Sequence, residues 1–182
     1  MRLIPASAFQ IQPWKNGGGL THEIARDDRD GRLLWRLSIA EVASDGPFSA
    51  FPGLARILTV IEGAGLRLGT PDGCIDALPF APVAFSGDLP VTGRRIGGPV
   101  RDLNVIHDPE RIAASVRILG AGTRLDCPPG PGRAYAILAP GTGTRLDGTA
   151  IPSGAAGFFR QGTAETSAHS RAILVLFEQV PT

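Results

Sequence analysis

The sequence has few of the residues that build disulfide-rich or metal-binding proteins, and it lacks long apolar runs. Its two cysteines, Cys74 and Cys127, lie in different halves without a Cys-x-x-Cys pair or a neighbouring histidine, so we expect free thiols and no zinc site. The apolar runs are far shorter than a bilayer span, and Met1–Pro5 lacks the hydrophobic core of a secretion signal. We therefore expect a cytoplasmic protein with no membrane partner.

An excess of charge of one sign is also absent. The chain carries 18 basic and 17 acidic residues, which gives a formal net charge of +1. Such a balance produces no whole-molecule field that would attract nucleic acid or an anionic membrane surface. We expect neither partner, and the sequence leaves the oligomeric state open, a homodimer included.

Long helices are not expected. The chain has 24 glycines and 16 prolines but few lysines and a single methionine, a composition typical of many turns and short elements. With 182 residues and 43% hydrophobic content, it can form one good-sized domain or two small fused ones. Alternating or continuous apolar residues predict strands at 33–42, 55–61, 101–106 and 172–177. The prediction is an all-β fold.

The second half of the chain repeats features of the first. When Arg56 is placed over Ala134, an offset of 78 residues, two glycines and an Arg-Leu pair coincide in the turn and strand that follow. Further along, Phe85 corresponds to Phe158 at an offset of 73. The shared order of strands and Gly or Pro turns is that of a small jelly-roll barrel, and it predicts a duplication.

The segment Pro13–Thr21 combines a cation, an amide, an aromatic side chain and three adjacent glycines. Folded proteins keep such glycines where the backbone bends sharply or lies against a ligand. Backbone N–H groups in this loop, beside Lys15 and Asn16, would suit an anion. A simple hairpin turn is the alternative, because Asn-Gly is a standard turn signal. The segment is not a nucleotide-binding P-loop, in which the lysine follows the glycines.

Several motifs, taken in order, resemble the HutD/Ves family. They are PWKNGGGLT at 13–21 with EIA at 23–25, WRLSIA at 35–40, DGPFSAFPG at 45–53, RIL at 56–58 and GPVRDLNV at 98–105. The match covers most of the first 108 residues, whereas the remainder resembles the family mainly in its Gly-punctuated strands. Ile106 departs from the family pattern, which has methionine there.

The resemblance implies a bicupin, with two cupin-like jelly-roll barrels in one compact unit. The barrels would span about 1–108 and 109–182, with segments that can be exchanged between them. It also implies an association with bacterial histidine-utilisation genes and regulatory binding of an acidic intermediate, with N-formylglutamate the first candidate and urocanate the second. The family motifs would place six residues in the pocket: Lys15, Asn16, Arg36, Arg56, Asp102 and Asn104.

The chemistry of these residues agrees with a small acidic ligand. Arginine binds a carboxylate through two parallel hydrogen bonds, so Arg36 and Arg56 with Ser38 would form a carboxylate site if they face the barrel cavity. Asp102 would hold an arginine in position, with Asn104 on the same face of its strand. Periodicity does not decide between cavity and solvent, so ordinary surface positions are the alternative. Trp14 and Phe48 can supply apolar walls. Gly17 and Gly18 would allow the backbone to lie close to the ligand.

Catalysis is the competing hypothesis. Metallocupins use a close His-x-His pair, a carboxylate and a later histidine, whereas His22, His107 and His169 are isolated here, so we expect no metal and no other cofactor. A site that gathers these three histidines across the fold is the alternative. No Gly-x-Ser-x-Gly motif appears.

Glu23 or Glu41 could act as an acid or base, although a surface carboxylate is the simpler interpretation of each. We therefore expect a non-catalytic binding protein that senses or buffers a small acidic metabolite, and no catalytic residues. The alternative is a metal-free cupin isomerase or lyase that acts on a small carboxylate. A third interpretation, action through a protein partner, would require an exposed apolar patch.

Overall fold

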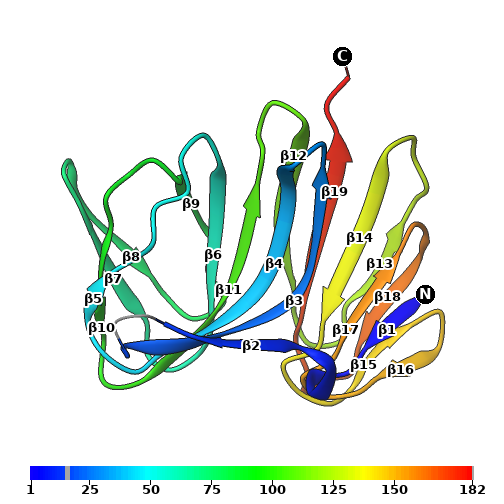
Figure 1. Ribbon diagram of the computed structural model, residues 1–182. Coiled ribbons are helices and arrows are strands. Elements are labelled where there is room, and N and C mark those ends of the chain that lie inside the picture. The colour runs from blue at the N-terminus through cyan, green and yellow to red at the C-terminus, as the bar shows by residue number, and fades with distance from the viewer. Residues whose placement is uncertain (15–16, 182) are drawn as a thin grey trace. The chain divides into compact units, whose positions relative to one another are not determined.

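A computed structural model describes residues 1–14 and 17–181 (Figure 1). Over these residues the regular elements are strands β1 to β19 and one short 3₁₀ helix, η1 (Ala6–Ala8). The all-β prediction is confirmed. Within the described part of the chain, no helix has the length and apolar character needed to cross a membrane.

The chain forms two compact units. The N-terminal unit is Gln10–Pro109, and the C-terminal unit combines Met1–Phe9 with Glu110–Thr182. The first nine residues join the C-terminal unit because β1 (Arg2–Ile4) pairs antiparallel with β17 (Ala156–Phe159). Figure 1 shows β1, in blue, among the yellow to red strands that the end of the chain supplies.

The N-terminal unit consists of two sheets that enclose an apolar core. In order across the sheet, the larger one contains β2 (Gln10–Pro13), β3 (Gly19–Arg29), β4 (Arg32–Val42), β11 (Val100–His107), β6 (Ala55–Glu62) and β9 (Val83–Ser86). The smaller one contains β5 (Gly46–Pro47), β10 (Thr92–Arg95), β7 (Leu66–Thr70) and β8 (Gly73–Ala77). Leu58 and Val60 of the larger sheet form a buried cluster with Leu66 and Leu68 of the smaller one.

The C-terminal unit is built in the same way. Its larger sheet has β1, β17, β14 (Arg133–Leu138), β19 (Ala172–Gln179) and β12 (Ile112–Leu119) in that order. Its smaller sheet has β13 (Arg124–Cys127), β18 (Gly162–Thr166), β15 (Thr144–Leu146) and β16 (Thr149–Ile151). Large apolar side chains, among them Tyr135, Ile137, Phe159 and Leu174, form its buried core.

The strand order supports the predicted duplication. The order β12-β19-β14-β17 repeats β4-β11-β6-β9, and β13-β18-β15-β16 repeats β5-β10-β7-β8. Arg56 pairs with Phe85 in one unit, and Tyr135 pairs with Phe159 in the other. Tyr135 therefore corresponds to Arg56 where the 78-residue offset had placed Ala134, and Phe159 corresponds to Phe85 where the 73-residue offset had placed Phe158. The 78-residue offset holds for the residues after the turn. Inside the strand, however, an alignment that is wrong by one residue matches inward-facing positions with outward-facing ones.

Candidate functional site

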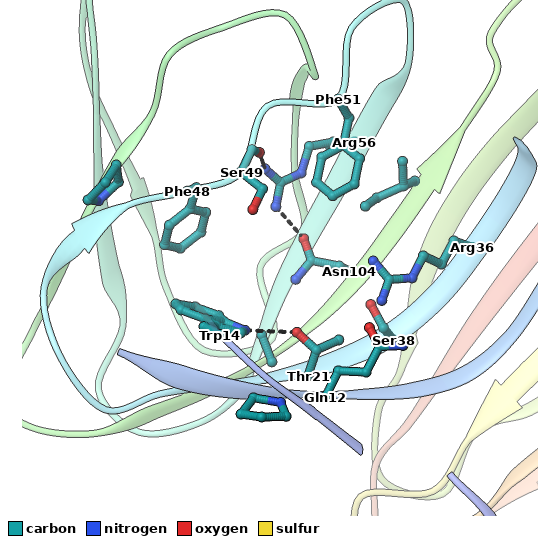
Figure 2. A pocket seen from close by; sticks show the side chains of 14 residues that line it. Gln12, Trp14, Thr21, Arg36, Ser38, Phe48, Ser49, Phe51, Arg56 and Asn104 are labelled. Carbon is teal, nitrogen blue, oxygen red and sulfur yellow. Dashed lines mark hydrogen bonds between the residues drawn. The ribbon is translucent and has the colours of Figure 1, made fainter. Parts of the chain in front are cut away.

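A cavity of about 460 Å³ lies in the N-terminal unit (Figure 2). Its floor is the inner face of the larger sheet, and the segment around β5 forms a wall. The residues that line it are Gln12, Pro13, Trp14, Thr21, Arg36, Ser38, Ala40, Pro47, Phe48, Ser49, Phe51, Arg56, Asn104 and Ile106.

The strand register explains why polar residues from distant segments meet in this cavity. On β11, Ile106 lies opposite Arg36 of β4 on one side and Arg56 of β6 on the other. Two residues earlier, Asn104 lies opposite Ser38 of β4. Residues directly opposite each other in a ladder point to the same face of a sheet, so this pairing directs both arginines, the amide and the hydroxyl to one side.

Arg56 is a buried cation held by polar and aromatic groups. It is only 5% exposed, its Nη2 donates to Asn104 Oδ1 at 2.7 Å, and its Nη1 donates to the Ser49 carbonyl at 3.3 Å. Three phenylalanine rings surround the guanidinium, with centroids 5.0 to 5.6 Å from Cζ, a cation–π arrangement. Burial lowers the pKa of Arg56 to about 10, with Asp102 opposing the shift. The group therefore stays charged at neutral pH.

Arg36 is the second cation of the cavity, and Glu23 is its partner. Arg36 Nε donates to Glu23 Oε2 at 2.6 Å. Glu23 is buried, with 8% exposure, so the interpretation of Glu23 as a surface carboxylate is wrong. Alternation along β3 places Glu23 on the same face as Thr21, and the ladder sets it opposite Ser38 of β4, so its inward direction could have been found.

Asp102 lies beneath the cavity lining. It is fully buried, its Oδ1 accepts from Asn104 Nδ2, and its Oδ2 has no hydrogen-bond partner among the described residues. Burial raises the pKa of the Asp102 carboxyl to about 7, against the opposing effects of Arg56 and the Asn104 hydrogen bond. Asn104 thus bonds Arg56 through its oxygen and Asp102 through its nitrogen, which joins the three side chains in one network.

Aromatic side chains form one wall of the cavity. Phe48 lies edge-on to Trp14, with ring centroids 6.2 Å apart, and Trp14 Nε1 donates to the Thr21 hydroxyl at 2.8 Å. On its other side Phe48 packs against Gly93 of β10, where an added Cβ would lie 2.4 Å from the ring. Glycine at this position therefore makes the room that the ring needs.

The glycine triplet forms a hairpin turn next to the cavity. Gly17 has a φ of 69°, a left-handed conformation that favours glycine. At Gly19 an added Cβ would lie 2.1 Å from the Glu41 carbonyl oxygen, so only glycine lets β3 approach β4 this closely. The Gly18 carbonyl accepts from the backbone N–H groups of Ala43 and Ser44. Gly17, Gly18 and Gly19 are not among the lining residues.

The structure brings together most of the residues that the sequence suggested for the pocket. Trp14, Arg36, Ser38, Phe48, Arg56 and Asn104 line the cavity. Asp102 lies beneath Asn104, Gly17 and Gly18 belong to the adjacent turn, and Lys15 and Asn16 fall outside the described residues.

Several lining residues were not anticipated, including Gln12, Thr21, Ser49 and Ile106. The carbonyl of Ser49 carries no signal in the sequence, whereas Thr21 and Ile106 alternate with other inward-facing positions and could have been found. Over the described residues, no three His, Cys, Asp or Glu side chains are grouped so that they could hold a metal ion.

Comparison with known proteins gives consistent matches. The HutD family model matches residues 6–150. An uncharacterized 21.2 kDa protein in the hutC 3' region of Pseudomonas putida is 42% identical over 130 residues, which are 69% of this chain and 67% of that protein.

Two solved structures match over nearly the whole chain. HutD from Pseudomonas fluorescens SBW25, in a formate condition, has a TM-score of 0.85 and 31% identity over 99% of both chains. A conserved protein of unknown function from Pseudomonas aeruginosa PAO1 has a TM-score of 0.82 and 33% identity, over 99% of this chain and 98% of that chain.

A more distant structure shares the fold alone. Oxalate decarboxylase from Lactobacillus farciminis, a cupin-fold protein, has a TM-score of 0.65 and 9% identity, over 97% of this chain and 85% of that chain. The match of the family model over residues 6–150 and the close relative together give the assignment: this chain belongs to the HutD family.

Proposed function

We propose that this protein binds a small carboxylate from histidine degradation in the cavity of its N-terminal unit, and that it senses or buffers this metabolite without converting it. The observation that carries the proposal is the presence of Arg36 and Arg56 on the same face of the sheet, on either side of Ile106, in a cavity of about 460 Å³. The histidine context comes from the family and from the genomic region named for the Pseudomonas putida relative.

The cavity has the features of a site for a small acid. Its volume is within the roughly 300–1,000 Å³ of ordinary ligand sites, which combine apolar walls with a few directed polar groups. Guanidinium groups supply paired donors for a carboxylate, and the Ser38 and Thr21 hydroxyls add further hydrogen-bonding groups. In Figure 2 the Asn104 amide lies near both guanidinium groups, and both arginines line the same cavity.

Two ligands fit this arrangement in different ways. N-formylglutamate has two carboxylates and would use Arg36 and Arg56 together. Urocanate has one carboxylate and a flat ring, so it would use one arginine and place its ring against the Trp14 and Phe48 wall. Thermal-shift measurements with N-formylglutamate, urocanate and glutamate distinguish them, because a ligand at 100 times its Kd adds about 2.7 kcal/mol to stability. An unchanged melting temperature with all three at millimolar concentration would contradict the proposal.

The first prediction concerns Arg56. The substitution Arg56→Ala should weaken binding by at least about tenfold, since hydrogen bonds to charged groups contribute roughly 1.5–3 kcal/mol. Arg67→Ala is the matched control, because Arg67 is an exposed arginine of the same unit, paired with Asp76 on the neighbouring strand. Isothermal titration calorimetry should show a weaker Kd for Arg56→Ala and an unchanged Kd for Arg67→Ala. Equal affinity in both variants would remove Arg56 from the site.

Binding is favoured over catalysis because neither Glu23 nor Asp102 is among the residues that line the cavity. Glu23 accepts from Arg36, and Asp102 lies beneath the lining. Nuclear magnetic resonance of each ligand after overnight incubation with the protein tests this point. An unchanged ligand supports a binding protein, and a new product formed in the presence of a chelator would identify a metal-free enzyme instead.

A further inference from the structure

We propose that the cavity binds its carboxylate ligand together with one proton, and that Asp102 is the group that takes up this proton. The inference rests on the proposed function, since it concerns the same cavity. It adds a second binding partner, the proton, and it makes Asp102 the residue that sets how much negative charge the cavity accepts.

The surroundings of Asp102 do not favour a negative charge. In the ladders of β11 it lies opposite Ala40 of β4 and Val60 of β6, two members of the apolar cluster of this unit. Its Oδ2 is buried with no hydrogen-bond partner among the described residues. An ionised carboxylate in such a place is costly unless a cation compensates it.

Arg56 provides that compensation. Among the described residues it is the positive group that stabilises the charged form of Asp102, while burial acts in the opposite direction. The Asn104 amide connects the two groups, with its oxygen on Arg56 Nη2 and its nitrogen on Asp102 Oδ1. Asp102 therefore keeps its charge only to the extent that Arg56 remains its partner.

The other charges around Asp102 are already paired. On β4 and β3, Arg36 and Glu23 form an ion pair at 2.6 Å. Arg101, the residue before Asp102 on β11, bridges Glu41 and Glu62, and neighbouring residues of a strand point to opposite faces.

The smaller sheet contributes mainly apolar side chains, Leu66, Leu68 and Ala77, to the cluster near Asp102. Its charged residues pair away from the cavity, with Arg67 bound to Asp76 and Arg95 bound to Asp45. Arg94 is exposed. Over the part of the chain that the structure describes, Arg56 is therefore the compensating charge for Asp102.

A ligand carboxylate would compete with Asp102 for Arg56. Two anions would then share one guanidinium in a poorly solvated site, and a proton on one of them relieves the repulsion. Asp102 is the better acceptor, because it is the more buried anion and because the ligand carboxylate gains new bonds to arginine. A proton from solvent forms an O–H bond at Asp102, and no other bond is made or broken. Figure 2 shows Asn104 facing the cavity. There it would contact the ligand carboxylate while its Nδ2 bonds Asp102.

Calorimetry in buffers of different ionisation enthalpy, phosphate and Tris at pH 8, tests the proposal with N-formylglutamate and urocanate as probes. For the wild type, the dependence of the binding heat on the buffer's ionisation enthalpy should give roughly one proton taken up per ligand bound. The Kd should also rise by about tenfold per pH unit above pH 7. Asp102→Asn, which keeps the shape and removes the charge, should show an uptake near zero and a pH-independent Kd. Asp76→Asn, at the exposed carboxylate that pairs with Arg67, should behave as wild type.

Each outcome decides something different. Binding without proton uptake by the wild type overturns the proton proposal and leaves the proposed function standing. Uptake that persists in Asp102→Asn assigns the proton to another group and also overturns it. Absence of binding by both probes overturns the proposed function and this inference with it. Infrared spectra add a readout that needs only wild-type protein. Adding ligand at pH 8 should increase the intensity of the carbonyl stretching band of a protonated, buried carboxylic acid.

Discussion

At the scale of single residues, the cavity depends on charges that are buried and compensated at close range. Arg56 is held by three aromatic rings, a carbonyl and an amide, and Arg36 is held by Glu23. Their residue types and the sides of the strands that they occupy could be read from the sequence. The pairing of Arg36 with Glu23 could not, because the register of β3 on β4 shifts after Glu23 and sets Arg26 opposite Arg36.

A second prediction at this scale concerns stability. The pKa of Asp102 is raised from 3.8 to about 7 in the folded protein. Below pH 3.8 the carboxyl is protonated in both states, and between 3.8 and 7 only the unfolded state releases its proton. The group therefore lowers the free energy of unfolding as pH rises through this window, by on the order of 4 kcal/mol, with no further loss above pH 7.

Urea unfolding of the wild type and of Asp102→Asn at pH 4.5, 6 and 8 measures this effect. The substitution should be increasingly stabilising, relative to the wild type, from pH 4.5 to pH 8. A difference between the two proteins that does not change with pH would mean that Asp102 titrates normally in the folded state.

At the scale of elements, the alternation of side-chain direction along each strand determines most of the site. The sequence predicted that Arg36 and Ser38 share one face of their strand, and the ladder across β4, β11 and β6 turns that face toward the cavity. The internal repeat was also visible, but its alignment inside β14 was one residue off, because β6 carries an extra residue at its bulge, between Val60 and Glu62. The wall formed by Phe48 depends on contact with β10, which no local pattern encodes.

This wall gives a third prediction. In Gly93→Ala the new Cβ would fall within 2.4 Å of the Phe48 ring, so the ring must move into the cavity. We expect ligand binding to weaken about tenfold or more while the fold is kept. Gly69→Ala on the neighbouring strand is the control, since its Cβ would lie 3.7 Å from the Thr92 carbonyl oxygen, an ordinary contact. Calorimetric Kd values and circular dichroism of both variants check the prediction, and equal Kd values would contradict it.

At the scale of the whole molecule, the two units share a strand order but differ in their interiors. By register, the positions of Arg56, Asn104 and Asp102 correspond to Tyr135, Leu174 and Ala172 in the C-terminal unit. Tyr135 stacks on Phe159 at 5.2 Å, in the place where Arg56 lies over Phe85 at 5.0 Å. The two units therefore share the scaffold, whereas this polar network belongs to the N-terminal unit.

A fourth prediction follows for the number of ligands. Each chain should bind one ligand, in the N-terminal unit, because the C-terminal unit replaces the cation and its amide partner with apolar side chains. Calorimetric titration should give a stoichiometry of one per chain. A second equivalent site that survives Arg56→Ala would contradict this.

The position of β1 also bears on how the chain folds as it is synthesised. Residues 10–109 can leave the ribosome and fold while the partner of β1, at Ala156–Phe159, has not yet been made. During that interval the first nine residues, with the apolar Leu3, remain an unpaired segment that could associate with other nascent chains.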